Sequence, residues 1–225
     1  MPKPFLAIFI LLISLSFPAK AEFMVSSAIV EFTPATPHQK DIEVISVSPT
    51  DDYLATEVYE LTNPGKPDEK RQLIEDTAKS KLLVTPNKTI LQGKSRKVMR
   101  FVLLTEPDEK EHIYRVVIKP VINELENTDK IGLKILVGYE VLVIIRPKEI
   151  SSDYKITRAG NKLTATNNGN SNILLQSGRQ CQNTECKAPP ITRIYPGTTE
   201  VIELPFSTAV EYSVWDGKTN KDVKF

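Results

Sequence analysis

The 225-residue sequence is poor in the residues that build reactive centres, with two cysteines, two histidines and one tryptophan. His38 lies in a proline-rich stretch, and His112 follows a charged run at 108–111, so we expect a solvated side chain at His112. Neither histidine belongs to an HExxH pattern, and no GxSxG or phosphate-loop sequence occurs. The sequence therefore predicts no enzyme, no metal site and no cofactor.

Long apolar runs are also scarce, and the one at the N-terminus has the features of an export signal. Residues 5–17 are almost wholly apolar, Lys3 precedes them, and Ala19-Lys20-Ala21 forms a small-x-small cleavage sequence. The run is roughly 13 residues long, whereas a membrane-spanning helix needs about 20. We expect cleavage after Ala21, export, and a mature chain that is not embedded in a membrane.

Neither sign of charge is in excess. The sequence has 29 Lys and Arg against 28 Asp and Glu, and removal of Lys3 and Lys20 leaves 27 basic residues. A nucleic-acid partner requires a concentrated basic face, which a net charge near −1 does not favour. We therefore expect no nucleic-acid partner.

The two cysteines, Cys181 and Cys186, are separated by four residues. In an oxidising compartment this spacing can close a tight disulfide loop, which stabilises by about 2 kcal/mol. A zinc site would need two further ligands, and the histidines are distant in sequence. We predict a disulfide that acts as a local staple.

Helical periodicity is missing, and short runs rich in Val, Ile, Leu, Tyr and Thr recur between Pro, Gly, Asn and Asp clusters. Seven strands are expected in the first part of the chain, at 27–33, 41–46, 54–61, 82–85, 97–104, 112–119 and 131–145. Residues 63–78, rich in Pro, Lys, Asp and Glu, are typical of a mobile loop with one helical turn. Seven strands in about 125 residues are typical of an immunoglobulin-like sandwich.

A second domain is expected after Arg146-Pro147, because proline ends the longest predicted strand. Shorter runs follow at 154–158, 162–167, 172–176, 192–195, 199–204, 210–215 and 222–225. The sequence Asn167-Asn168-Gly169-Asn170 is a strong turn signal between two of them. We predict an all-β chain of two immunoglobulin-like β-sandwich domains, at 22–148 and 149–225; one large barrel is the alternative.

The predicted strand at 131–145 is about 15 residues long, where 5 or 6 are usual. Its apolar residues alternate with Gly132 and Lys134 before becoming continuous, and the first four are Ile131, Leu133, Ile135 and Val137. The strand is either central and buried on both faces, or its first half is an exposed edge kept for a partner. A long apolar edge is an aggregation hazard unless a partner covers it, so we favour a protein-binding edge.

Several sequences form a recognisable pattern between residues 82 and 115: Leu82-Leu83-Val84-Thr85-Pro86, Gln92-Gly93-Lys94-Ser95, Val98-Met99-Arg100-Phe101, and the run 107–115 ending in Tyr114-Arg115. The Arg146-Pro147 strand end, the 167–170 turn, the cysteine pair and Tyr195-Pro196-Gly197 extend it. With these residues the chain resembles the periplasmic chaperones of chaperone–usher pili, particularly the branch that serves alpha-type fimbriae and common pili.

The resemblance implies two immunoglobulin-like sandwiches at an angle, with a cleft between them, acting in the periplasm. Pilin subunits lack their last strand, and the seventh strand of the chaperone fills the gap before an outer-membrane usher receives the subunit. The inserted residues would be Ile131, Leu133, Ile135 and Val137, and no nucleotide is needed. The implied partners are therefore pilin subunits and an usher.

The resemblance is incomplete at the group that anchors the C-terminal carboxylate of the pilin. Related chaperones use an arginine in the first strand and a lysine late in the seventh, but residues 26–32 contain no basic residue and Glu140 lies near the lysine position. Arg100, Arg115 and Lys119 are expected on the non-core side of neighbouring strands and could substitute. For Arg100 the alternative is an ion pair with Asp216 across the domain junction.

Two other functions compete with the chaperone. A structural pilus subunit or adhesin domain should carry an alternating apolar donor segment at its mature N-terminus, and residues 22–26 are too short for one. A secreted hydrolase would need a nucleophile–base pair, which the sequence does not supply. Both comparisons favour the chaperone.

Overall fold

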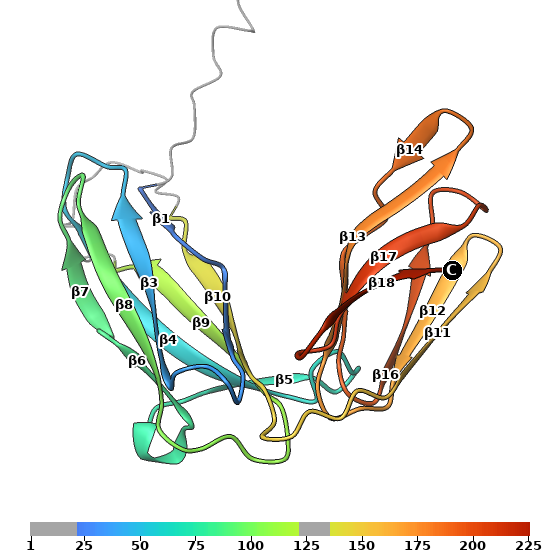
Figure 1. Ribbon diagram of the computed structural model, residues 1–225. Helices are drawn as coiled ribbons and strands as arrows, with labels where there is room; N and C mark the ends of the chain where they lie inside the picture. Colours follow the sequence, from blue (N-terminus) through green and yellow to red (C-terminus); the bar gives the residue numbers. More distant parts are fainter. Residues whose placement is uncertain (1–21, 122–135) are drawn as a thin grey trace, which may run out of the picture.

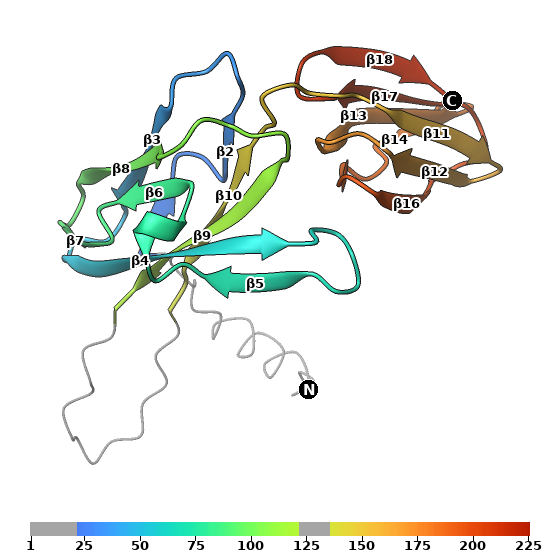
Figure 2. The same ribbon diagram turned by 90° about the horizontal axis from the view of Figure 1, so that it is seen from below.

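The computed structural model describes residues 22–121 and 136–225 of the chain. The predicted signal peptide, residues 1–21, lies outside the described residues. Regular structure in the described ranges consists of β-strands and one 3-10 turn, Thr77–Lys79. No helix in these ranges is long and apolar enough to cross a membrane. The strands form two sandwiches set at an angle, which confirms the predicted fold class (Figures 1 and 2).

The N-terminal sandwich packs a four-stranded sheet against a six-stranded sheet. The four-stranded sheet has the order β1 (Phe23–Val25), β3 (Gln39–Ser46), β8 (Arg96–Leu103), β6 (Leu82–Thr85). The six-stranded sheet has the order β2 (Ile29–Phe32), β10 (Tyr139–Ile145), β9 (His112–Pro120), β4 (Asp52–Thr62), β5 (Lys70–Leu73), and β7 (Lys88–Leu91) also pairs with β4.

Period-two alternation directs the apolar side chains of these strands into one core, as expected for half-buried strands. On β8, Met99, Phe101 and Leu103 are buried, and on β9 the buried set is Tyr114, Val116 and Ile118. The faces predicted for these two strands are therefore confirmed. The loop predicted at residues 63–78 contains the edge strand β5, whose four exposed residues give no apolar pattern, so that part of the prediction is wrong. The helical turn predicted there lies at Thr77–Lys79.

The C-terminal sandwich is smaller. Its three-stranded sheet has the order β11 (Tyr154–Ala159), β12 (Lys162–Asn167), β16 (Thr198–Glu203). The opposite sheet has the order β14 (Glu185–Lys187), β13 (Ile173–Gln182), β17 (Val210–Trp215), β18 (Asn220–Lys224), with β15 (Thr192–Ile194) also paired to β13. The predicted turn at 167–170 lies between β12 and β13.

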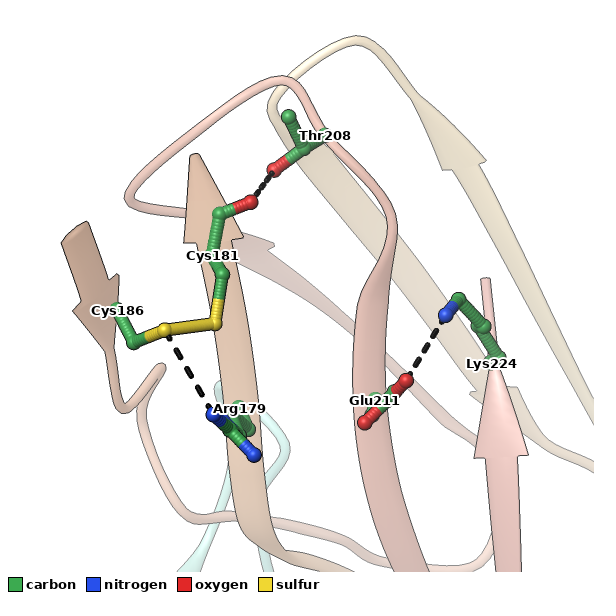
Figure 3. The surroundings of a disulfide bond; sticks show 6 residues. All are labelled: Arg179, Cys181, Cys186, Thr208, Glu211 and Lys224. Carbon is green, nitrogen blue, oxygen red and sulfur yellow. Dashed lines mark hydrogen bonds and ion pairs between the residues drawn. A yellow bond between two sulfur atoms is a disulfide. The ribbon is translucent and has the colours of Figure 1, made fainter. Parts of the chain in front are cut away.

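The disulfide lies at the end of the C-terminal sandwich, on the β13–β14 hairpin (Figure 3). Cys181 and Cys186 are directly opposite each other in the strand register, and the bond between them confirms the sequence prediction. The hydroxyl of Thr208 donates to the carbonyl of Cys181 at 2.8 Å, which ties the hairpin to the loop before β17. The bond is a surface staple, remote from the domain junction.

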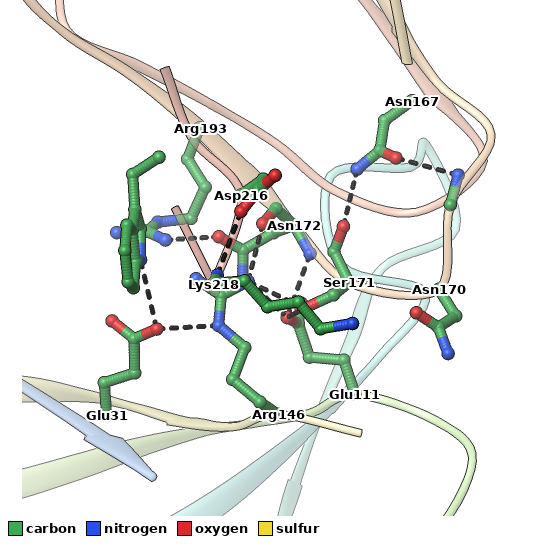
Figure 4. Close-up of polar contacts among 12 residues, drawn as sticks. Glu31, Glu111, Arg146, Asn167, Asn170, Ser171, Asn172, Arg193, Asp216 and Lys218 are labelled. Atoms are coloured by element: carbon green, nitrogen blue, oxygen red, sulfur yellow. Dashed lines mark hydrogen bonds and ion pairs between the residues drawn. The ribbon is translucent and has the colours of Figure 1, made fainter. Parts of the chain in front are cut away.

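Arg146, directly after β10, is fully buried at the domain junction (Figure 4). Its guanidinium donates to the carboxylates of Glu31 (2.7 Å) and Glu111 (3.1 Å), which belong to the N-terminal domain. It also donates to the hydroxyl of Ser171 (2.7 Å) and the carbonyl of Asn172 (2.6 Å), both in the C-terminal domain. One buried cation therefore bonds to both sandwiches.

Two neighbouring contacts hold the same junction. The indole N–H of Trp215 donates to Glu31 at 3.2 Å. Gly217 lies against the guanidinium of Arg146, and a Cβ atom there would stand 3.1 Å from its Cζ; its φ of +91° also favours glycine. The relative placement of the sandwiches thus depends on polar groups from both sides.

His112 is not solvated, so that prediction is wrong. Its Nδ1 lies 3.2 Å from Glu60 on β4, and its Nε2 lies 3.1 Å from Asp108 in the β8–β9 loop. The hydrogen bond to Glu60, and the weaker effect of Asp108, raise the pKa of His112 against the opposing effects of burial and Lys81. Burial opposes ionisation of Asp108, but bonds from the Lys110 amide, Lys81 and His112 lower its pKa. Protonated His112 therefore holds the loop to β4.

This arrangement predicts a pH-dependent stability. A raised pKa contributes stability that is fully present below the unfolded value of about 6.5 and is lost as pH rises through the folded pKa. Asp108 stays ionised over that window. We expect the parent to exceed His112→Gln in free energy of unfolding by more below about pH 6 than above about pH 9. Urea unfolding at the two pH values measures the difference, and an equal gap at both would contradict the protonated clamp.

Candidate partner-binding site

Strand β10 has one unpaired side over its first residues. It pairs antiparallel with β9 from Tyr139 to Ile145, but β2 pairs parallel with it only from Leu142 onward. The Leu142 amide donates to the Ala28 carbonyl at 2.9 Å, so this side of β10 faces β2. Peptide groups alternate sides along a strand, so the Glu140 amide faces the same way. Within the described residues no strand pairs with that side at 139–141, and we call it the open edge.

The open edge exists because the chain changes sheets between β1 and β2. The Ser26 amide donates to the Glu43 carbonyl, and the Glu43 amide donates to the Ser26 hydroxyl, both at 2.8 Å. These bonds hold β1 in the sheet of β3, and β2 begins beside β10 only at Ile29. The start of β10 is therefore left without a neighbour on that side.

The side chains near the open edge change from core residues to exposed ones. Val141 and Val143 are buried in the domain core, and Tyr139 packs on Phe23 with ring centroids 5.2 Å apart. Val137 precedes Tyr139 by two positions and is 51% exposed. It is the described member of the predicted donor set; Ile131, Leu133 and Ile135 lie outside the described residues.

The outer face of the six-stranded sheet is the face turned away from the N-terminal core. At the junction end it carries an apolar cluster covered by Tyr195 of the C-terminal domain: Leu61, Ile113, Leu142 and Ile144. A charged zone follows farther along the sheet. It consists of Glu57, Arg71, Arg115, Lys119 and Glu140. The face thus runs from an apolar, covered end into exposed ion pairs.

Arg115 and Lys119 lie on this outer face, on alternate positions of β9, as predicted. The Lys119 ammonium is 2.7 Å from Glu57, and the Arg115 guanidinium is 3.5 Å from Glu140. Glu140 also pairs with Arg71 of β5, which sequence reasoning missed because β5 was assigned to a loop. Within residues 22–121 and 136–225, no group of three or more His, Cys, Asp or Glu side chains is placed to hold a metal.

Arg100 lies elsewhere. Its strand β8 pairs with β3 and β6, so the prediction that Arg100 shares neighbouring strands with Arg115 and Lys119 is wrong. It forms a two-pronged bond to Asp41 at 3.0 and 2.9 Å. The alternative pairing with Asp216 is also wrong, because Asp216 accepts from the amides of the loop that follows it.

The ion pairs of the charged zone are partly exposed. The hydrogen bond to Lys119, with a second from Tyr59, lowers the pKa of Glu57, and the same pair raises the pKa of Lys119. Both partners are partly exposed, and exposed ion pairs contribute little net stability. An incoming carboxylate could therefore replace Glu57 or Glu140 without disrupting the fold.

Comparison with known proteins gives one family and many related structures. Residues 65–151 match the family described as pili and flagellar-assembly chaperone, PapD N-terminal domain. No curated protein sequence matches the chain.

Solved structures share the fold over almost the whole length. The Class 5 fimbriae chaperone CfaA is 23% identical, with 90% of this chain and 97% of that chain covered and a TM-score of 0.61. The E. coli chaperone DraB is 20% identical, with 90% of this chain and 96% of that chain covered and a TM-score of 0.59. A chain of the complex of Salmonella enterica SafA pilin with the SafB chaperone is 16% identical, with 93% of this chain and 98% of that chain covered and a TM-score of 0.62.

Proposed function

We propose that the chain is a pilus-assembly chaperone that captures pilin subunits by strand donation; the match of residues 65–151 to a chaperone family and the two-domain fold support this. The donated part is the donor segment, residues 131–137, which leads directly into β10. Its apolar side chains, Ile131, Leu133, Ile135 and Val137, enter the groove left by the missing strand of the subunit. Backbone hydrogen bonds along the added strand supply affinity that is independent of sequence.

The observation that carries the proposal is the open edge of β10. A strand that has a free side at 139–141, and an alternating apolar sequence immediately before it, can add to an incomplete sheet without unfolding its own domain. Full burial of an apolar side chain contributes roughly 1.5–3 kcal/mol, so four contribute about 6–12 kcal/mol before ordering costs. That range gives a tight hold that another donor strand can still displace.

The cellular setting follows from the same proposal. The signal sequence directs the chain to the periplasm, where the Cys181–Cys186 disulfide is stable. Captured subunits then pass to an outer-membrane usher. A structural pilus subunit is not favoured, because such a subunit lacks its last strand and β10 is present here.

Co-purification tests the function directly. The mature chain, tagged at its C-terminus, is isolated from the periplasm of cells that also express candidate pilin subunits. We expect β-sandwich subunits of the pilin type to accompany it in an equimolar complex. Recovery of the chain alone, or with unrelated enzymes, would contradict the chaperone function.

The outer-face cations provide a sharper test of how the subunit is held. If Arg115 or Lys119 binds the terminal carboxylate, Arg115→Ala or Lys119→Ala should weaken pilin binding roughly thirtyfold or more. The melting temperature should hardly change, since these ion pairs are partly exposed and such pairs contribute little net stability. Titration of pilin complex formation measures the affinity.

Arg96→Ala is the matched control for these variants. Arg96 is an exposed cation that pairs with Glu43 at 3.2 Å on the other sheet. It should bind pilin like the parent. Parental affinity in both outer-face variants would mean that the carboxylate is held by other groups.

A further inference from the structure

A row of apolar side chains crosses the outer face at the end far from the C-terminal domain. Ile90 on β7 and Tyr53 on β4 are directly paired, and the Val121 amide donates to the Tyr53 carbonyl at 2.7 Å. Figure 2 shows β4 running from this end toward the C-terminal domain. The three side chains are 47%, 53% and 45% exposed, respectively. We call Ile90, Tyr53 and Val121 the distal apolar row.

Among the described residues, the three side chains of the row are not part of the hydrophobic core of the N-terminal sandwich. Leu54 and Leu91, the next residues along β4 and β7, fill the core beneath it. The row side chains line a surface depression of about 320 Å³ together with Leu54, Lys88 and Thr89. Single exposed apolar residues are ordinary, but a contiguous set marks an interaction surface.

The row adjoins the proposed donor segment. The register of β9 and β10 ends at the pair Ile118–Tyr139; Val121 lies three residues after Ile118 and Leu136 three residues before Tyr139, so both chain segments leave the sheet at this end. Leu136 lies in sequence between Ile135 and Val137, whose side chains belong to the donated set. Val121 follows β9, the neighbour of β10, while Tyr53 on β4 and Ile90 on β7 lie one and two strands farther away. A subunit that takes up the donor segment at this end of the sheet therefore reaches the row first at Val121.

We propose that the distal apolar row is a second contact surface for the captured pilin, seating apolar side chains at the rim of its open groove. This inference rests on the proposed strand donation, and it adds a contact that strand addition alone does not require. The row covers the rim while the donor segment fills the groove. It would thus add side-chain selectivity to an interaction whose backbone bonds accept any sequence.

Substitution of the row in the full mature chain tests the proposal. Val121→Ser and, independently, Ile90→Ser should each weaken pilin binding about tenfold, as expected for one apolar side chain removed from a covered contact. Val98→Ser is the matched control, because Val98 is a strand valine, 48% exposed, on the outer face of the other sheet. It should bind like the parent. Circular dichroism melts establish that all three variants are folded.

The outcomes separate this proposal from strand donation. If both row variants bind pilin like the parent while Leu133→Asp loses binding, the proposed pilin contact of the row is wrong and strand donation still stands. Parental binding by Leu133→Asp would remove the basis of both. If the row variants change only self-association in sedimentation, or only transfer of captured subunits to the outer membrane, the row serves another partner and the proposal fails.

Discussion

Replacing Leu133 with Asp should abolish pilin capture and leave the protein folded. An unpaired carboxylate would have to enter an apolar groove, which costs several kcal/mol, a large part of the roughly 6–12 kcal/mol that the donor segment supplies. The fold should survive because the proposed donor segment serves the partner more than its own sandwich. Pull-down with pilin, alongside circular dichroism of the free protein, measures the two properties separately.

The neighbouring residue supplies the control. Lys134→Asp introduces the same side chain on the opposite side of the strand, where the change should be tolerated much better. A folded Leu133→Asp protein that binds pilin at parental strength would overturn strand donation. If Leu133→Asp fails to fold while Lys134→Asp folds, Leu133 belongs to the core of the protein's own sandwich and the donor set is wrongly placed.

Arg146→Met is expected to destabilise the protein by about 3–5 kcal/mol, the effect typical of removing one partner of a buried ion pair. Glu111, whose side chain is only 2% exposed, would be left without its cation, and Glu31 would lose its closest partner. Urea unfolding measures the loss. Small-angle scattering should also show a broader distribution of angles between the domains, because Arg146 bonds to both.

Two further variants show whether the charge is responsible. Arg146→Met combined with Glu111→Gln should recover part of the lost stability, since no buried carboxylate then remains unpaired beside Ser171. Arg100→Met removes an exposed cation from a two-pronged pair with Asp41 and should change stability little. Equal destabilisation by Arg146→Met and Arg100→Met would show that the junction network contributes nothing beyond an exposed pair.

The elements that the sequence predicted best are strands with one buried face. On β8 and β9, alternate apolar residues follow directly from burial of one side of a pleated strand. Strand β5 has no such signal, because Lys70, Arg71, Gln72 and Leu73 are all exposed and only pairing with β4 defines the strand. Sequence periodicity indicates which side chains are buried. It does not reveal a strand that is held only by backbone hydrogen bonds.

The polar sites depended on contacts between distant parts of the chain, and there prediction was weaker. Arg146 was recognised as a strand end, but its carboxylate partners lie 115 and 35 residues away. His112 was assigned to solvent from its near neighbours, whereas Glu60 comes from another strand. Arg100 was misplaced because alternation gives the face of a strand and not the sheet to which the strand belongs.

The change of sheet between β1 and β2 has a consequence for the size of any added strand. Because β2 occupies one side of β10 from Leu142 onward, a strand added along that side must stop before this residue. The Ala28 carbonyl, bonded to the Leu142 amide, marks the limit. The start of β2, with the Ala28 carbonyl before it, therefore sets where a visiting strand ends, whatever the sequence of the visitor.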